Sequence, residues 1–258
     1  MPVASNVEKL SPESETDGDG LPINELFCSL QGEGKLSGIP SVFVRSSGCN
    51  LRCWFCDSYH TSWEPAGAWL SIDDIVDEVR SYDQADHVVF TGGEPMIHDE
   101  SVELLDELAD YGYHTTVETN GTIYRDAAID LASISPKLAS STPTPERDPK
   151  GDGEWAERHK NQRIDLDALS KFVDTYDSQL KFVVTSSDDM PEIEDLVEQI
   201  RDTAGTTITD DDVLLMPEGM TREELDTKRN DVAELAMEYG YRYTPRLHVD
   251  LWNDAPGT

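Results

Sequence analysis

Three of the chain's four cysteines stand within one short segment, as Cys49, Cys53 and Cys56 in the spacing C-x3-C-x2-C. Clustered cysteines in a chain that we expect to be cytoplasmic indicate a metal or redox centre rather than a disulfide framework. Their thiolates are good ligands for zinc and for iron–sulfur clusters. Three ligands are one fewer than a closed structural zinc site requires, so the fourth partner decides the chemistry.

Two kinds of centre fit this spacing. A zinc site could recruit His60, four residues beyond Cys56, as its fourth ligand. It could instead recruit the remaining cysteine, Cys28, but the strand-to-loop segment around Cys28 favours a buried side chain that acts as a small hydrophobic residue. A non-catalytic zinc or iron–sulfur module is therefore one alternative. In a [4Fe-4S] cluster, three cysteines leave one iron open, and an open iron can bind a substrate or a cofactor directly. The second arrangement is a catalytic centre.

Polar and glycine-rich segments recur along the chain, each directly after an apolar run that predicts a strand. They read TGGEP at 91–95, ETNG at 118–121, SPK at 135–137 and PEG at 217–219. Ligands of α/β proteins bind at the carboxyl ends of parallel strands. We therefore expect these segments to lie around one site.

The elements that must position these segments alternate along the chain. Apolar, β-branched runs predict strands, and apolar residues at helical spacing predict the helices between them. Ser71 is the expected N-cap of one helix, with Asp74 in the role that a capping box gives to glutamate. We expect strands at 23–26 (or a turn there), 41–45, 87–90, 114–118, 132–135, 180–184, 213–216 and 241–248, and helices at 72–80, 102–108, 127–131, 166–176, 193–200 and 225–238.

This alternation predicts an α/β fold with a parallel sheet wound by right-handed crossovers. There are too few units for a full eight-stranded barrel, so we expect an incomplete, TIM-like one. The segment 138–165 is rich in Ser, Thr, Pro, Asp and Gly, which indicates a long polar loop or insertion. We expect residues 1–20 to be a disordered acidic tail and residues 21–258 to be a single domain.

Charge is the most unusual feature of the composition. The 258 residues include 53 Asp and Glu against 20 Lys and Arg, which gives a formal net charge of −33. Such a surface repels nucleic-acid phosphates and anionic membranes, so we expect no direct nucleic-acid partner and no membrane partner. Acidic residues spread along the whole chain are typical of proteins that stay soluble in concentrated salt. We therefore expect a halophilic protein.

The chain resembles the radical S-adenosylmethionine (SAM) superfamily. The resemblance lies in the cysteine spacing, with the aromatic Phe55 before the last cysteine, and in GGEP at 92–95. It implies a partial barrel of the radical SAM type, a [4Fe-4S] cluster held by Cys49, Cys53 and Cys56, and SAM on the open iron. Electron transfer would then split the sulfonium of SAM and give a 5′-deoxyadenosyl radical.

A narrower resemblance covers most of the chain after residue 24. Besides the strand-end segments, it rests on FCSLQGEG at 27–34, VFVR at 42–45, CDS at 56–58, KFVV at 181–184, MPEG at 216–219 and LH at 247–248. In this order they resemble the 7-carboxy-7-deazaguanine synthase (QueE) family. That family converts 6-carboxy-5,6,7,8-tetrahydropterin into 7-carboxy-7-deazaguanine and releases ammonia. The product leads to 7-deazaguanine bases of tRNA such as queuosine and archaeosine.

This second resemblance assigns the substrate-binding residues. Arg45 would hold the substrate carboxylate, because a guanidinium binds a planar carboxylate through two parallel hydrogen bonds. Ser58 would be a ligand of Mg²⁺, whose coordination shell substrate oxygens would complete. Hydrogen-bond donors and acceptors of the QGEG loop would pair with the amide and aminopyrimidine groups on the edge of the pterin. The expected substrate-binding residues are Leu30, Gln31, Gly32, Glu33, Arg45, Thr91 and His248.

The same resemblances assign the SAM-binding residues. Backbone oxygens at 92–95 would contact the amino group of SAM, and polar side chains at 118–120 would hold its ribose hydroxyls. The expected residues are Phe55, Gly92, Gly93, Glu94, Glu118, Asn120, Ser135, Pro136 and Lys137. No side chain need be a strong acid or base for a radical step, so we expect no catalytic residue beyond the cluster-bound SAM.

The resemblance also implies partners. These are a small-molecule pterin substrate, an electron donor such as flavodoxin or ferredoxin, and a second copy of the chain in a homodimer. An alternative within the superfamily is a glycyl-radical-activating enzyme, which uses similar cysteines and GGEP on a protein partner. That activity would leave the QGEG loop and Arg45 without a purpose.

Overall fold

The computed structural model describes residues 3–4, 20–151, 153–253 and 255. One sheet runs through them in the order β1-β2-β3-β5-β6-β7-β8-β9-β10, with β4 paired to β2 beside this path. Neighbours from β3 to β10 are parallel, whereas β2 is antiparallel to its three partners. The strands are β1 (Val3–Ala4), β2 (Leu21–Leu30), β3 (Pro40–Ser46), β4 (Ala68–Leu70), β5 (His87–Gly92), β6 (His114–Thr119), β7 (Leu131–Ile134), β8 (Asp177–Val184), β9 (Val213–Pro217) and β10 (Arg242–Tyr243).

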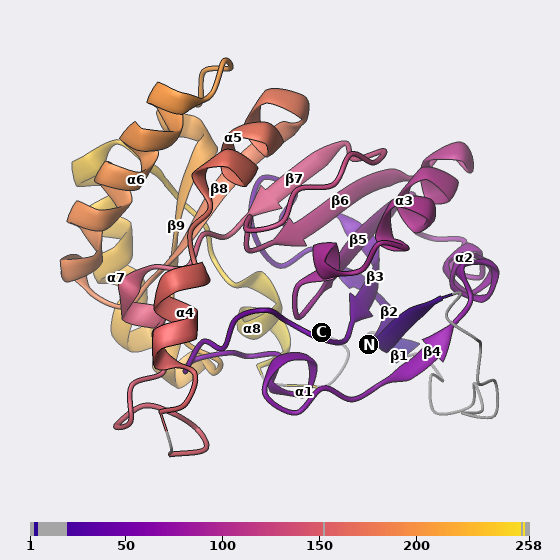
Figure 1. Ribbon diagram of the computed structural model, residues 1–258, viewed down its shortest axis with the longest axis horizontal. Coiled ribbons are helices and arrows are strands. Elements are labelled where there is room, and N and C mark those ends of the chain that lie inside the picture. The colour runs from indigo at the N-terminus through magenta and orange to yellow at the C-terminus, as the bar shows by residue number, and fades with distance from the viewer. Residues whose placement is uncertain (1–2, 5–19, 152, 254, 256–258) are drawn as a thin grey trace.

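The helices divide into two groups around the curved sheet. In Figure 1, α2 (Ile72–Arg80), α3 (Ser101–Asp110), α5 (Leu166–Thr175) and α6 (Met190–Thr203) lie along one side, and α7 (Arg222–Tyr239) packs on β9. The short helices α1 (Tyr59–Ser62), α4 (Ala156–Gln162) and α8 (Leu247–Trp252) gather on the other side. None of the described helices combines the length and the hydropathy that a membrane crossing requires.

Alternate residues of the strands face two different environments. Val42 and Val44 of β3 pack into the main apolar core with the helices, whereas Phe43 between them packs with Phe27 and Val89 in a small inner cluster. The rings of Phe27 and Phe43 stack with their centroids 5.1 Å apart. Because side chains of a strand alternate between its faces, every second residue of these strands faces the interior of the curved sheet.

The predicted α/β partial barrel is confirmed. Strands β3, β5, β6, β7, β8, β9 and β10 form the parallel series, and in the described part of the chain the terminal strands β1 and β10 do not pair with each other. The helix expected at 72–80 has these bounds, and the Ser71 hydroxyl accepts the Asp74 N–H as its cap. The Asp74 carboxylate, however, accepts the Ser71 hydroxyl at 2.7 Å and not the backbone N–H that a capping box would use.

Two predicted elements were wrong. No helix forms at 127–131, because Ala127 donates its N–H to the Tyr176 hydroxyl and Ala128 donates to Asp106, which leaves 131–134 to form β7. The strand expected at 241–248 is limited to β10. Pro245 lacks the N–H that a ladder needs, and α8 begins two residues later.

Two further segments differ from expectation in extent. The short strand or turn at 23–26 is the middle of the ten-residue strand β2. The segment 138–165 is not a plain loop, because it holds a 3₁₀ turn at Ala139–Ser141 and the helix α4. The tail predicted at 1–20 lies outside the described residues, except for β1 and Gly20.

Candidate active site

One cavity of about 620 Å³ opens at the carboxyl ends of the parallel strands. A volume of this size suits small-molecule ligands. Its walls come from the cysteine loop, the QGEG loop, the ends of β3, β5, β6 and β7, and the start of α8. Every residue predicted for the site lines this cavity except Glu94 and Pro136, which are buried beneath its wall.

The cysteine loop directly follows β3. None of the three thiols is in a disulfide, and each sulfur has at least one hydrogen-bond donor of the protein beside it. Leu51 N–H donates to Cys49 at 3.4 Å, and the Ser62 hydroxyl, at 3.1 Å, and the Ser58 N–H donate to Cys56. The Ser141 hydroxyl lies beside Cys53 and lowers the pKa of its thiol, which partly offsets the effect of burial. Burial raises the pKa of all three thiols, that of Cys53 to about 12. An isolated thiolate is therefore unfavourable here, and a bound cation would stabilise it.

This donor set fits an iron–sulfur cluster better than a single ion. Across the described ranges, no three His, Cys, Asp or Glu side chains converge on one ion position. In a cluster each thiolate binds its own iron, so the sulfurs need not share one centre. Cys28 packs in the main apolar core with the outward-facing residues of β2, away from the cavity. The zinc alternative thereby loses one of its two possible fourth ligands.

The turn after β5 is packed against backbone on both sides. A Cβ on Gly92, whose φ is 134°, would stand 2.1 Å from the Ser46 carbonyl oxygen, and one on Gly93 would stand 2.1 Å from that of Gly48. Glu94 N–H donates to the Gly48 carbonyl at 2.8 Å. Only glycine allows this approach, so GGEP fixes the strand end against the start of the cysteine loop.

The Glu94 side chain points away from the cavity. Its carboxylate accepts the Thr119 hydroxyl at 2.7 Å, the Asn120 N–H at 2.6 Å and the Met96 N–H at 3.1 Å. Burial raises the pKa of this carboxyl despite these bonds. Glu94 therefore joins the ends of β5 and β6, and a SAM contact at this position would use its backbone.

Two more strand ends carry polar side chains beside the cysteines. Asn120 donates to the Asn50 side-chain oxygen at 2.9 Å, next to Cys49. Lys137 donates to the Ser135 hydroxyl at 2.7 Å. These groups lie where a polar cofactor next to the cysteines would meet them.

A second group of polar side chains begins at Arg45 on β3. Its Nε donates to Glu25 at 2.9 Å and one Nη donates to the Ser58 hydroxyl at 3.0 Å, which leaves further N–H groups of the fork for a ligand. The Ser58 hydroxyl in turn donates to Asp57 at 3.2 Å. Asp57 also forms an ion pair with Arg246. Its carboxylate is thus engaged with the protein.

The most buried charges of the cavity form a network around Glu33. Lys181 lies 2.6 Å and Arg246 2.9 Å from its two oxygens, and Lys181 lies 3.5 Å from Glu118. Burial opposes the charge of Glu33, but the two cations outweigh it, and the pKa of the carboxyl is lowered. Burial likewise lowers the pKa of Lys181, and the charges of Glu118 and Glu33 outweigh it, so that its net shift is upward. Both groups stay ionised inside the protein.

The QGEG loop is held by this network from two directions. Gln31 donates to Glu118 at 3.2 Å, and Thr91 donates to the other Glu118 oxygen at 3.1 Å. Leu247 N–H donates to the Gly32 carbonyl at 2.8 Å, and a Cβ on Gly32 would stand 1.9 Å from the ring of His248. The sequence near the end of the chain thus closes over the loop that follows β2.

Two residues of this network were not predicted for the site. Lys181 lies between Leu180 and Phe182 in a run that is otherwise apolar, and a lone charge in a buried strand is a signal that could have found it. Arg246 follows Pro245 in the segment that was wrongly predicted as a strand. Nothing in its local pattern indicated that it would be buried against Glu33.

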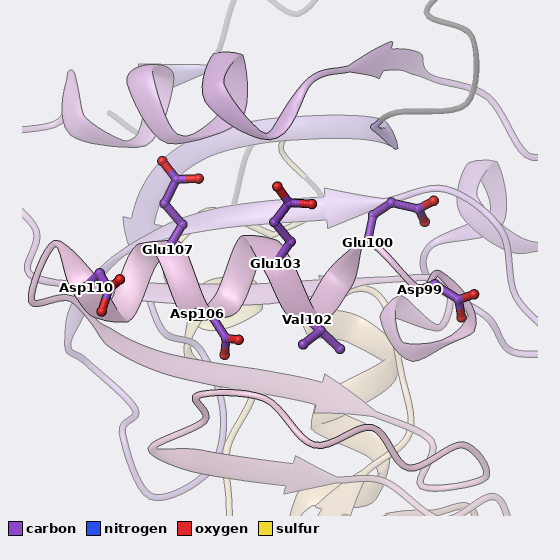
Figure 2. A pocket seen from close by; sticks show the side chains of 7 residues that line it. All are labelled: Asp99, Glu100, Val102, Glu103, Asp106, Glu107 and Asp110. Atoms are coloured by element: carbon purple, nitrogen blue, oxygen red, sulfur yellow. The ribbon is translucent and has the colours of Figure 1, made fainter.

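A second, open hollow lies along α3. Figure 2 shows Glu100, Glu103 and Glu107 projecting from one side of this helix, with Asp106 on the other side. Only acidic residues and Val102 line it, and among the described residues no three of them converge as ligands of one metal ion. It is an acidic solvated face.

Comparisons with known proteins agree with this geometry. Residues 43–139 match the Radical SAM superfamily model. The chain is 69% identical, over the full length of both chains, to a 7-carboxy-7-deazaguanine synthase of Halobacterium salinarum. It is 41% identical to one of Rhodopirellula baltica, over 95% of this chain and 94% of that one. The crystal structure of QueE from Escherichia coli superposes with a TM-score of 0.63 at 25% identity, over 89% of this chain and 95% of that one.

Proposed function

This chain belongs to the 7-carboxy-7-deazaguanine synthase family, and we propose that it converts 6-carboxy-5,6,7,8-tetrahydropterin into 7-carboxy-7-deazaguanine with release of ammonia. One observation carries the proposal. A single cavity joins three cysteines that fit a cluster to a set of paired charges that fit a carboxylated pterin. The product would serve the synthesis of 7-deazaguanine bases of tRNA.

Cys49, Cys53 and Cys56 would hold a [4Fe-4S] cluster, which with SAM supplies hydrogen-atom abstraction at the pterin carbon beside the carboxylate. Asn120, Lys137 and the backbone at 92–95 stand next to these cysteines and would bind the polar parts of SAM. The protein contributes placement and the exclusion of water.

The charged end of the cavity would bind the substrate. Arg45 keeps N–H groups for the substrate carboxylate beyond those that it gives to Glu25 and Ser58. Glu33 is held ionised by Lys181 and Arg246, and an ionised carboxylate accepts two N–H bonds of an aminopyrimidine edge. Because these charges are already paired, little reorganisation is needed when the substrate enters.

We also propose that Mg²⁺ binds at Ser58. Ser58 offers one hydroxyl oxygen beside Arg45, and Mg²⁺ prefers oxygen ligands from substrate and water to a complete protein cage. Ser58 would therefore bind Mg²⁺ only together with the substrate carboxylate. The Ser58→Ala variant should lose the Mg²⁺ dependence of turnover while its cluster absorbance stays that of the wild type.

The reaction also needs an electron. We propose a one-electron donor protein such as flavodoxin or ferredoxin, and a homodimer as the working assembly, both on the family resemblance alone. Replacing dithionite by each purified donor protein tests the first, and light scattering of the purified protein tests the second.

The decisive assay uses the anaerobically reconstituted protein in concentrated KCl, with SAM, dithionite and 6-carboxy-5,6,7,8-tetrahydropterin. The expected products are 5′-deoxyadenosine, 7-carboxy-7-deazaguanine and ammonia. A protein that carries a full cluster and forms neither nucleoside nor deazaguanine would contradict the proposal. Formation of 5′-deoxyadenosine alone would keep the radical SAM chemistry and reject this substrate.

A further inference from the structure

The segment 138–165 packs directly on the cysteine loop. Trp54 donates its backbone N–H to the Ser141 carbonyl at 3.2 Å and its indole N–H to the Ser140 carbonyl at 2.7 Å. The Arg52 guanidinium stacks on the Trp155 ring, 4.2 Å from its centroid. Residues on both sides of Cys53 are therefore held by a segment that follows it by about ninety residues.

His159 of α4 lies at the centre of this contact and has no exposed surface. The backbone N–H of Arg52 donates to its Nδ1 at 3.3 Å, and its Nε2 lies 2.8 Å from the Ser141 hydroxyl. Since Nδ1 accepts, the proton of the neutral ring is on Nε2, which donates to Ser141. This tautomer is assigned from the hydrogen bonds.

Ser141 then has one proton left to donate. Two acceptors are in reach, the Leu138 carbonyl at 2.6 Å and the sulfur of Cys53. A sulfur that carries thiolate charge is the acceptor of a charge-assisted bond, which is the stronger kind. When the cysteines carry a cluster, the Ser141 hydroxyl should therefore donate to the sulfur of Cys53 rather than to the Leu138 carbonyl.

We propose that His159 and Ser141 are positioning residues that hold the cysteine loop in its ligating conformation, and that Ser141 donates a hydrogen bond to Cys53 once the cysteines carry a cluster. This inference rests on the proposed function in so far as it requires a [4Fe-4S] cluster on the three cysteines. The other two sulfurs take their bonds from Leu51, Ser58 and Ser62, which are near them in sequence. Cys53 alone depends on the distant segment.

The first test compares Ser141→Ala with Ser140→Ala. Both changes delete one hydroxyl from the same 3₁₀ turn, but the Ser140 hydroxyl is buried with no partner among the described residues. Hydrogen bonds to ligating sulfurs raise the reduction potential of a cluster. In Ser141→Ala we expect a more negative midpoint potential by EPR-monitored titration and about tenfold faster cluster loss to an iron chelator. Ser140→Ala should match the wild type in both.

The second test separates the two bonds of His159. In His159→Asn the side-chain oxygen can replace Nδ1 as acceptor for Arg52, and in His159→Gln the amide can replace Nε2 as donor to Ser141. We expect His159→Gln to keep the potential closer to the wild-type value than His159→Phe, which loses both bonds. Thermal unfolding of each cluster-free variant measures the purely structural cost.

The outcomes distinguish a failure of the proposed function from a failure of the positioning role of His159 and Ser141. A wild-type protein that takes up no [4Fe-4S] cluster would overturn the positioning role together with the proposed function. A normal wild-type cluster, with Ser141→Ala and His159→Phe equal to the wild type in potential and in chelator resistance, would overturn the positioning role alone. His159 would then be a buried structural histidine.

Discussion

Carboxylates occur in this protein in two opposite settings. On α3, Glu103 and Glu107 project from one side of the helix into the open hollow (Figure 2) and have no oppositely charged side chain within ion-pair distance among the described residues. In the cavity, Glu33 contacts two cations at 2.6 and 2.9 Å. Water and salt stabilise the first kind, whereas the fold itself stabilises the second.

The difference shows where the few basic residues of an acidic chain matter most. Only 20 Lys and Arg accompany 53 Asp and Glu, and two of them, Lys181 and Arg246, are buried beside one glutamate. A surface carboxylate can exchange its counterion with the solution. A buried one cannot, so the loss of its partner leaves an uncompensated charge.

The largest effect should follow the loss of a buried partner. Arg246→Ala leaves Glu33 and Asp57 short of a cation and should lower the free energy of unfolding by about 3–5 kcal/mol. Denaturant unfolding in concentrated KCl measures this loss. The matched control is Arg201→Ala, which removes an exposed pair with Asp210 at 2.8 Å. It should cost at most about 1 kcal/mol. Equal losses in the two variants would erase the distinction between the two settings.

A buried carboxylate that is satisfied by hydrogen bonds should be the next most sensitive. In Glu94→Gln, one acceptor oxygen becomes an amide that faces the N–H of Asn120 or the hydroxyl of Thr119. We expect a loss of about 2–3 kcal/mol in the free energy of unfolding. Glu103→Gln on α3 is the control, and it should change stability by less than about 0.5 kcal/mol. A Glu94→Gln variant as stable as this control would mean that the bonds of Glu94 contribute nothing.

Lowering the pH should affect buried and exposed groups differently. Burial, followed by the charges of Arg163 and Lys137, lowers the pKa of His159 to about 4 from 6.5. Between these values the unfolded chain binds a proton that the folded chain does not, so stability falls as the pH is lowered through this window. The loss between pH 7 and pH 5 should be about 2 kcal/mol. His159→Gln should remove this part of the pH dependence, and an unchanged slope would refute the assignment.

The smallest effect is expected on the acidic face. Glu103 and Glu107 are one turn apart on α3, and like charges at this spacing destabilise a helix by a few tenths of a kcal/mol. Glu107→Gln should therefore raise stability by about 0.3 kcal/mol at 0.05 M salt. At 1 M salt the Debye length is about 3 Å and the gain should vanish. A gain that persists in molar KCl would show that this face is not governed by screening.

The residues that line the cavity were easier to predict from the sequence than the buried residues that hold them in place. The cysteines, GGEP, QGEG and Arg45 are marked by residue type and spacing, and the strand ends around them follow from alternation. Arg246 and His159 carry no such mark. Their environment arises from contacts with Glu33 and Arg52, more than a hundred residues away, which no local pattern encodes.

The contact between α8 and the QGEG loop has a consequence for the order in which the protein is built. The cysteine loop and its support at 138–165 are synthesised before residues 246–248. The wall that Arg246 and His248 contribute is therefore added last. All three cysteines are therefore present in the growing chain before the residues that wall this side of the cavity have been made.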